Sequence, residues 1–134
     1  MTPAVERRLL QAAVAIACLV PLATGGESVI RGAAFLRGVP QPVPPDLDSH
    51  FRYLSGIFLA LGIAFATTVP AIERLGPRFR LLAAMVVAGG LARAVSWLAI
   101  GAPGPGHRFG LVMELGVVPL LVLWQGRVAR RFGA

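Results

Sequence analysis

The amino-acid sequence predicts an all-α fold, an integral membrane four-helix transmembrane bundle with a Pro-rich outer loop between helices 1 and 2. Of its 134 residues, 56% are hydrophobic and only 14% are charged, and the mean hydropathy is +0.73. These values are typical of membrane proteins. The apolar residues gather into four stretches, each about as long as the hydrocarbon core of a bilayer requires. We therefore expect one domain, residues 1–134, with spans at about 9–26, 51–72, 81–102 and 109–126.

The charge is strongly basic, with thirteen basic residues, all of them arginine, against six acidic residues and a net charge of +7. In a soluble protein this excess would suggest nucleic acid as a partner. Here the arginines cluster at the ends of apolar stretches, where positive charge sets membrane orientation, so we expect no nucleic acid. Both termini are predicted to be cytoplasmic in a bacterial inner membrane, because that orientation places Arg7, Arg8, Arg74, Arg78, Arg80, Arg127, Arg130 and Arg131 inside, and only Arg31, Arg37, Arg52 and Arg108 outside.

The first span, 9–26, follows two arginines and ends in small residues. The same features resemble a secretory signal peptide, which is the alternative interpretation of this segment. The lone cysteine, Cys18, lies inside the span and excludes a disulfide framework. From Glu27 to Leu47 the composition predicts a long loop, which contains four prolines, and Asp48 or Ser49 is expected to cap the next helix.

Small residues recur every fourth position in the second and third spans and predict close helix contacts. The two strips are Gly56, Ala60 and Ala64, and Ala84, Ala88, Ala92 and Ser96. The fourth span contains Pro119, which removes the hydrogen bond to Leu115 and predicts a kink.

The third span carries one charge, Arg93, near its middle. Its 22 residues rise about 33 Å as a helix, against a hydrocarbon core of about 30 Å. A charge at that depth costs roughly 2.5–3.5 kcal/mol, so it should face a partner or water. A short hairpin joins this span to Glu114, which predicts an Arg93–Glu114 ion pair. The two side chains lean in opposite directions on antiparallel helices, but Gly89 and Gly90 leave room for the arginine to turn.

The expected orientation places three further polar residues, Asp48, His50 and Arg52, near this pair at the outer side. We therefore predict one outward-facing ligand-binding pocket. The alternatives are a local capping salt bridge for Asp48 with Arg52, four residues apart, and a purely structural Arg93–Glu114 pair. No metal is expected, since one histidine beside one carboxylate supplies too few ligands for zinc. His107 is expected to be solvated. The predicted pocket residues are Asp48, His50, Arg52, Arg93 and Glu114.

Three segments carry a resemblance to a known family: Leu47 to Gly56, Gly89 to Arg93, and Glu114 to Gln125 with Pro119 inside. They resemble the recurring segments of domain-of-unknown-function family 4345, a group of small bacterial four-helix membrane proteins. The resemblance covers nearly the whole chain and implies a multi-pass inner-membrane bundle. It supplies no established activity, so no catalytic residue is carried over.

These observations favour a non-enzymatic membrane protein, without a cofactor, that binds a small amphiphile, lipid or partner subunit through the pocket. Arg52 and Arg93 would take an anionic head group. Membrane lipids and a homo-oligomer or membrane partner subunit are the expected partners. One alternative is a small oligomeric transporter or proton pathway through His50 and Glu114. A second is a membrane-embedded lipid-modifying enzyme with the same two residues as acid and base.

Overall fold

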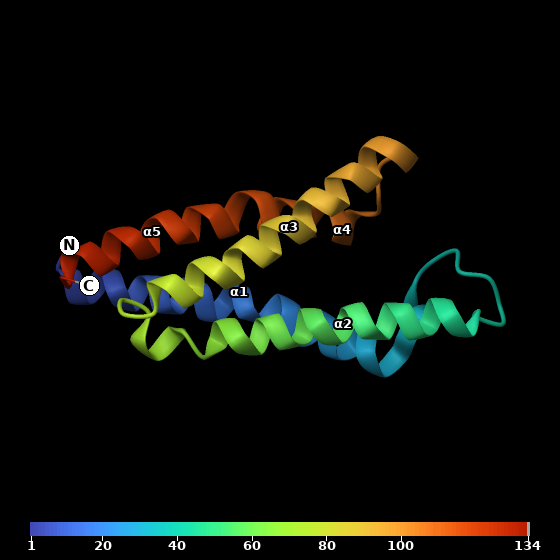
Figure 1. The fold of residues 1–134 in the computed structure, drawn as a ribbon, viewed down its shortest axis with the longest axis horizontal. Helices are drawn as coiled ribbons and strands as arrows, with labels where there is room; N and C mark the ends of the chain where they lie inside the picture. The colour runs from blue at the N-terminus through green and yellow to red at the C-terminus, as the bar shows by residue number, and fades with distance from the viewer. Residues whose placement is uncertain (134) are drawn as a thin grey trace. The chain divides into compact units, whose positions relative to one another are not determined.

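The computed structural model describes residues 1–133, and this part of the chain contains helices and turns but no strand, which confirms the all-α class (Figure 1). The elements in chain order are α1 (Pro3–Arg31), the 3-10 turn η1 (Gly32–Phe35), α2 (Pro45–Ala66), the 3-10 turn η2 (Val69–Ala71), α3 (Gly76–Ile100), α4 (Pro105–Val112), the π-helical segment η3 (Met113–Val117) and α5 (Val118–Arg131).

Four helical segments are long and apolar enough to cross a membrane, so the predicted number of spans is confirmed by length and composition. All four extend beyond the predicted bounds at one end or both. They are Pro3–Phe35, Pro45–Ala71, Gly76–Ile100 and Pro105–Arg131.

Prolines set the starts of three helices, because a proline in the first turn loses no hydrogen bond and already has a helical φ. Pro45, Pro77 and Pro105 each lie in the first turn of their helix. The prediction that Asp48 or Ser49 caps the second helix is therefore wrong. Helix α2 begins at Pro45 without a side-chain cap, and Asp48 lies inside its first turn.

The chain divides into two compact units. Unit 1 contains residues 1–12 and the chain from Thr68 onward, and unit 2 contains Ala13–Thr67. Each unit is described by itself.

In unit 2, α2 packs closely on the second half of α1 through glycines. A Cβ added at Gly25 would lie 3.0 Å from the backbone nitrogen of Leu59, and one at Gly62 would lie 2.9 Å from the ring of Pro21. The predicted contact strip on α2 is wrong at Gly56, around which space is open. The Pro21 ring projects from α1 and requires a residue without a side chain opposite it, which fixes the contact at Gly62 instead.

In unit 1, α3 and α5 lie side by side (Figure 1). Helix α3 buries Phe79, Leu82 and Ala83. The predicted strip from Ala84 to Ser96 lies on another face of the helix and is exposed. The apolar core of the unit consists of Leu10, Ile72, Phe79, Leu82, Ala83, Leu121 and Val128.

The fourth membrane-length segment is interrupted by η3 rather than simply kinked. Its π-helical turn is closed by the backbone N–H of Val118, which donates to the carbonyl of Met113. Pro119 follows in the first turn of α5 and has no N–H to offer Leu115. The wider turn therefore compensates for the hydrogen bond that the proline cannot donate. π turns of this kind are frequent at functional sites.

Candidate functional site

The most distinctive polar contact in unit 1 joins Arg93 on α3 to Glu114 on η3. The guanidinium donates through Nε to Glu114 Oε2 and through Nη2 to Oε1, both at 3.0 Å. Such a two-point pair is strong and fixes orientation. The Glu114 side chain is 10% exposed and the Arg93 side chain 32%. The contact predicted from the sequence is therefore present in the structure.

Gly90 allows the two carrying segments to approach. A Cβ added there would lie 2.8 Å from the Cβ of Glu114 and 2.8 Å from a methyl carbon of Leu115. Space around the neighbouring Gly89 is open. Of the two glycines singled out in the sequence, Gly90 is thus the one that the pair depends on.

His107 on α4 completes the site. It is exposed, as predicted, but the prediction missed its contact with Arg93. Its Nδ1 lies 2.8 Å from Nη1 of Arg93. A guanidinium has only donors, so Nδ1 is the acceptor in this contact. The short α4 turn after the glycine- and proline-rich hairpin, rather than any spacing visible in the sequence, brings the ring to Arg93.

Two of the five N–H groups of Arg93 remain without a partner among the described residues, one on each Nη nitrogen. Glu114 accepts two of the others and His107 accepts the third. The site is therefore an anchored guanidinium, held in place by one carboxylate and one imidazole, with hydrogen-bonding capacity left on its exposed side.

The second polar contact, in unit 2, joins Asp48 and Arg52 on α2 to the end of α1. Asp48 accepts from the Ala33 amide at 2.8 Å through Oδ1 and from Arg52 Nε at 2.7 Å through Oδ2. Arg52 donates through Nη1 to the carbonyls of Val29 and Ile30. These are the free groups that a helix end leaves unsatisfied. The salt-bridge alternative is thus observed, although what it caps is the preceding helix.

Gly32 is required at this turn for two reasons. Its φ is +65°, and a Cβ there would overlap both the Asp48 carboxylate and the Arg52 guanidinium. Of the other predicted pocket residues, His50 is exposed on α2 and makes no hydrogen bond or ion pair in the described chain. Four of the five predicted residues thus form two contacts, Asp48 with Arg52 in unit 2 and Arg93 with Glu114 in unit 1, and His50 takes part in neither.

Comparison with known proteins gives one family. Its sequence model, described as Domain of unknown function (DUF4345), matches residues 9–125. The chain belongs to this family. The match includes both polar contacts and confirms the resemblance seen in the sequence. No curated protein and no solved structure matches the chain.

This DUF4345 chain also contains a buried polar cluster that sequence reasoning missed. Glu6 is 2% exposed and accepts from Arg127 Nε at 2.8 Å and from Arg131 Nη1. Glu73 is 7% exposed and lies 3.3 Å from Nη1 of Arg7.

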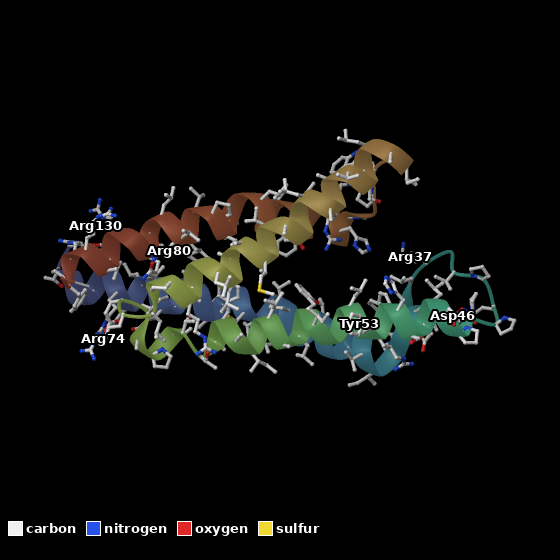
Figure 2. The ribbon with its side chains drawn as sticks, in the orientation of Figure 1. Arg37, Asp46, Tyr53, Arg74, Arg80 and Arg130 are labelled. Atoms are coloured by element: carbon white, nitrogen blue, oxygen red, sulfur yellow. The ribbon has the colours of Figure 1, made fainter. Side chains whose placement is uncertain are left out.

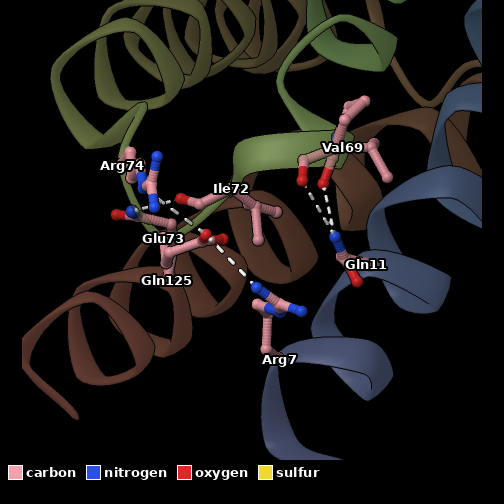
Figure 3. Close-up of polar contacts among 8 residues, drawn as sticks. Arg7, Gln11, Val69, Ile72, Glu73, Arg74 and Gln125 are labelled. Carbon is pink, nitrogen blue, oxygen red and sulfur yellow. Dashed lines mark hydrogen bonds and ion pairs between the residues drawn. The ribbon is translucent and has the colours of Figure 1, made fainter. Parts of the chain in front are cut away.

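Two glutamine side chains close to Arg7 and Glu73 donate hydrogen bonds to backbone carbonyls (Figure 3). Gln11 donates to the carbonyl of Val69 at 2.8 Å, and the fully buried Gln125 donates to the carbonyl of Ile72 at 2.9 Å. Both carbonyls belong to the turn around η2. Gln11 reaches this turn from α1, and Gln125 reaches it from α5. One feature of the sequence could have indicated this cluster. Because acidic residues are few, a glutamate beside several arginines at the end of a span is a candidate for a buried ion-pair partner of those arginines.

Proposed function

We propose that this chain is a multi-pass protein of the bacterial inner membrane that binds a small amphiphile with an anionic head group through Arg93. The observation that carries the proposal is the guanidinium itself. It is held by Glu114 and His107 and keeps two N–H groups on a side chain that is one-third exposed. Guanidinium groups with paired free N–H groups match carboxylate and phosphate oxygens.

An amphiphile fits better than a water-soluble anion because of the surroundings of the site. Several large apolar residues near Arg93 and Glu114 are exposed, among them Val95, Leu98, Phe109 and Val112. In a membrane these side chains contact acyl chains, and a ligand that reaches Arg93 must share that environment. Its polar end would meet the guanidinium and its apolar end the lipid.

The proposed orientation has both termini in the cytoplasm. Contacts inside unit 1 support this topology, because Arg131 donates to the carbonyl of Met1 and Arg7 pairs with Glu73. The N-terminus, the turn before α3 and the C-terminal helix end therefore lie together. These three segments carry the eight arginines assigned to the inside by the positive-inside rule.

Native mass spectrometry of the full chain in mild detergent tests the binding. An alkyl phosphate, a fatty acid and an alkyl phosphocholine of the same chain length serve as probes. We expect the two anionic probes to bind wild type, and Arg93→Lys to weaken them at least about tenfold, because an ammonium cannot reproduce the two-point geometry.

Arg108→Lys is the matched control, since Arg108 is an exposed arginine of the same hairpin that contacts the Pro103 carbonyl. Its affinity for all three probes should equal that of wild type. Equal binding of the anionic probes to wild type, Arg93→Lys and Arg93→Ala would overturn the proposal and leave a purely structural ion pair.

A further inference from the structure

A second feature of unit 1 lies far from Arg93, at the other end of α3. A groove of about 460 Å³ runs between α3 and α5 and is lined by apolar side chains with Arg80 at one end. Thirteen residues separate Arg80 from Arg93, which corresponds to about 20 Å along a helix. The apolar lining consists of Ala83, Ala84, Val87, Pro119, Val122 and Leu123.

The hollow arises from short side chains. Ala83 and Ala84 face Pro119 and Val122, and none of these four fills the space that a leucine or phenylalanine would occupy. The groove is open to one side, and its lining is apolar apart from Arg80, as a site for an acyl chain requires. The apolar lining offers a polar ligand no hydrogen-bond partner except Arg80.

Arg80 supplies the charge that such a groove lacks. Eight arginines gather at this end of unit 1 and share two carboxylates, Glu6 and Glu73; Figure 2 labels three of them, Arg74, Arg80 and Arg130. The exposed arginines that pair with neither carboxylate in the described chain are Arg8, Arg78, Arg80 and Arg130. Of these four, only Arg80 lines the groove.

The position of the Arg80 guanidinium is also defined. A Cβ added at Gly76 would lie 3.0 Å from its Nη1, so the missing side chain at Gly76 gives the guanidinium its place beside the start of α3. The N-terminus of a 25-residue helix adds positive potential at the same point. Charge and apolar groove therefore meet at one place.

We infer that this groove is a binding site for an anionic phospholipid, with its phosphate on Arg80 and one acyl chain between α3 and α5. Basic residues at a membrane surface attract anionic lipids, and the groove adds a fixed place for one chain. This site is independent of the one at Arg93. In the proposed orientation its lipid belongs to the cytoplasmic leaflet.

The test titrates the purified full chain in mild detergent with phosphatidylglycerol, with phosphatidylcholine of the same acyl chains, and with inorganic phosphate as a competitor. Native mass spectrometry counts the retained lipids. We expect wild type to retain one phosphatidylglycerol at least about tenfold more tightly than phosphatidylcholine. Arg80→Gln should abolish this preference, whereas Arg78→Gln and Arg130→Gln should keep it.

Ala84→Trp and Ala84→Val separate the groove from the charge. Ala84 is exposed, so both variants keep the core intact, and they should reduce retained phosphatidylglycerol in order of side-chain size. Equal losses at Arg80, Arg78 and Arg130 would overturn the inference in favour of diffuse attraction. Full retention in Ala84→Trp, or complete competition by inorganic phosphate, would overturn it in favour of a simple anion site.

Discussion

At the scale of single residues, four of the six acidic side chains fix the positions of arginine side chains through ion pairs. Glu6, Asp48, Glu73 and Glu114 each hold at least one arginine across different elements or at a helix end. The sequence predicted Glu114 because its partner was the lone charge of a span. It did not predict Glu6 or Glu73, because both lie among several arginines and spacing alone cannot say which pair forms.

Removing the charge of Glu114 should destabilise the protein. In Glu114→Gln the half-buried Arg93 keeps its charge without a carboxylate, and we expect the free energy of unfolding to fall by about 2 kcal/mol. Unfolding in a detergent titration, followed by helical circular dichroism, measures the change.

Glu27→Gln is the matched control for this substitution. Glu27 pairs with Arg31 four residues away, and both side chains are about half exposed. Its loss should be under about 0.5 kcal/mol. Similar losses of stability at Glu114 and Glu27 would contradict a special role for Glu114. The double variant Arg93→Glu with Glu114→Arg exchanges the two charges, and it would also contradict that role if it were no more stable than either single variant.

At the scale of elements, the sequence predicted which segments are helices and misplaced their ends. The sequence predicted a loop that includes Pro45, whereas Pro45 lies in the first turn of α2, where a missing N–H has no consequence. Small-residue strips were also misassigned, because a four-residue repeat cannot show which glycine faces a bulky neighbour. Gly62 and Gly90 are set by Pro21 and Leu115 on the opposing segments.

The adjacent glycines 89 and 90 provide a matched test of helix packing. Gly90→Ala should push η3 away from α3, break the two-point contact at Arg93 and destabilise the protein by about 1–3 kcal/mol. Gly89→Ala meets no atom and should be neutral or stabilising by up to about 1 kcal/mol, because alanine favours a helix. The thermal unfolding midpoint of each variant measures the difference, and equal midpoints would show that η3 does not rest on Gly90.

At the scale of the whole molecule, hydropathy was sufficient to predict four membrane-length helices, because each span exceeds the bilayer requirement without help from packing. The predicted pocket of five residues depended on long-range geometry between residues of both units, and it stays a prediction. Arg52 illustrates why. Its guanidinium donates hydrogen bonds to two backbone carbonyls of α1, and no residue pattern in the sequence could reveal this contact.

The proposed orientation can be tested by chemical labelling in intact bacterial cells. In a Cys18→Ala background, Ala102→Cys in the hairpin between α3 and α4 should react with a membrane-impermeant maleimide. Thr2→Cys and Arg74→Cys should react only after the cells are opened. Labelling of Thr2→Cys in intact cells would reverse the orientation, and labelling of Thr2→Cys without Arg74→Cys would contradict a shared side.

Glu6 should be important for the stability of unit 1 as a whole. Glu6→Gln leaves Arg127 and Arg131 without their carboxylate, and we expect the protein to unfold at a lower detergent concentration than wild type. Asp46→Asn is the control, since Asp46 is exposed at the start of α2 and makes no side-chain hydrogen bond or ion pair with the described residues, so its variant should unfold as wild type does. A smaller loss at Glu6 than at Asp46 would refute the prediction.

The pairing of Glu6 also bears on how the protein is made. Its basic partners lie 121 and 125 residues later in the sequence. During synthesis the ribosome must therefore add 121 further residues after Glu6 before the carboxylate can meet Arg127. Until then Glu6 lacks both of its arginine partners on α5, so this pairing within unit 1 forms late in synthesis.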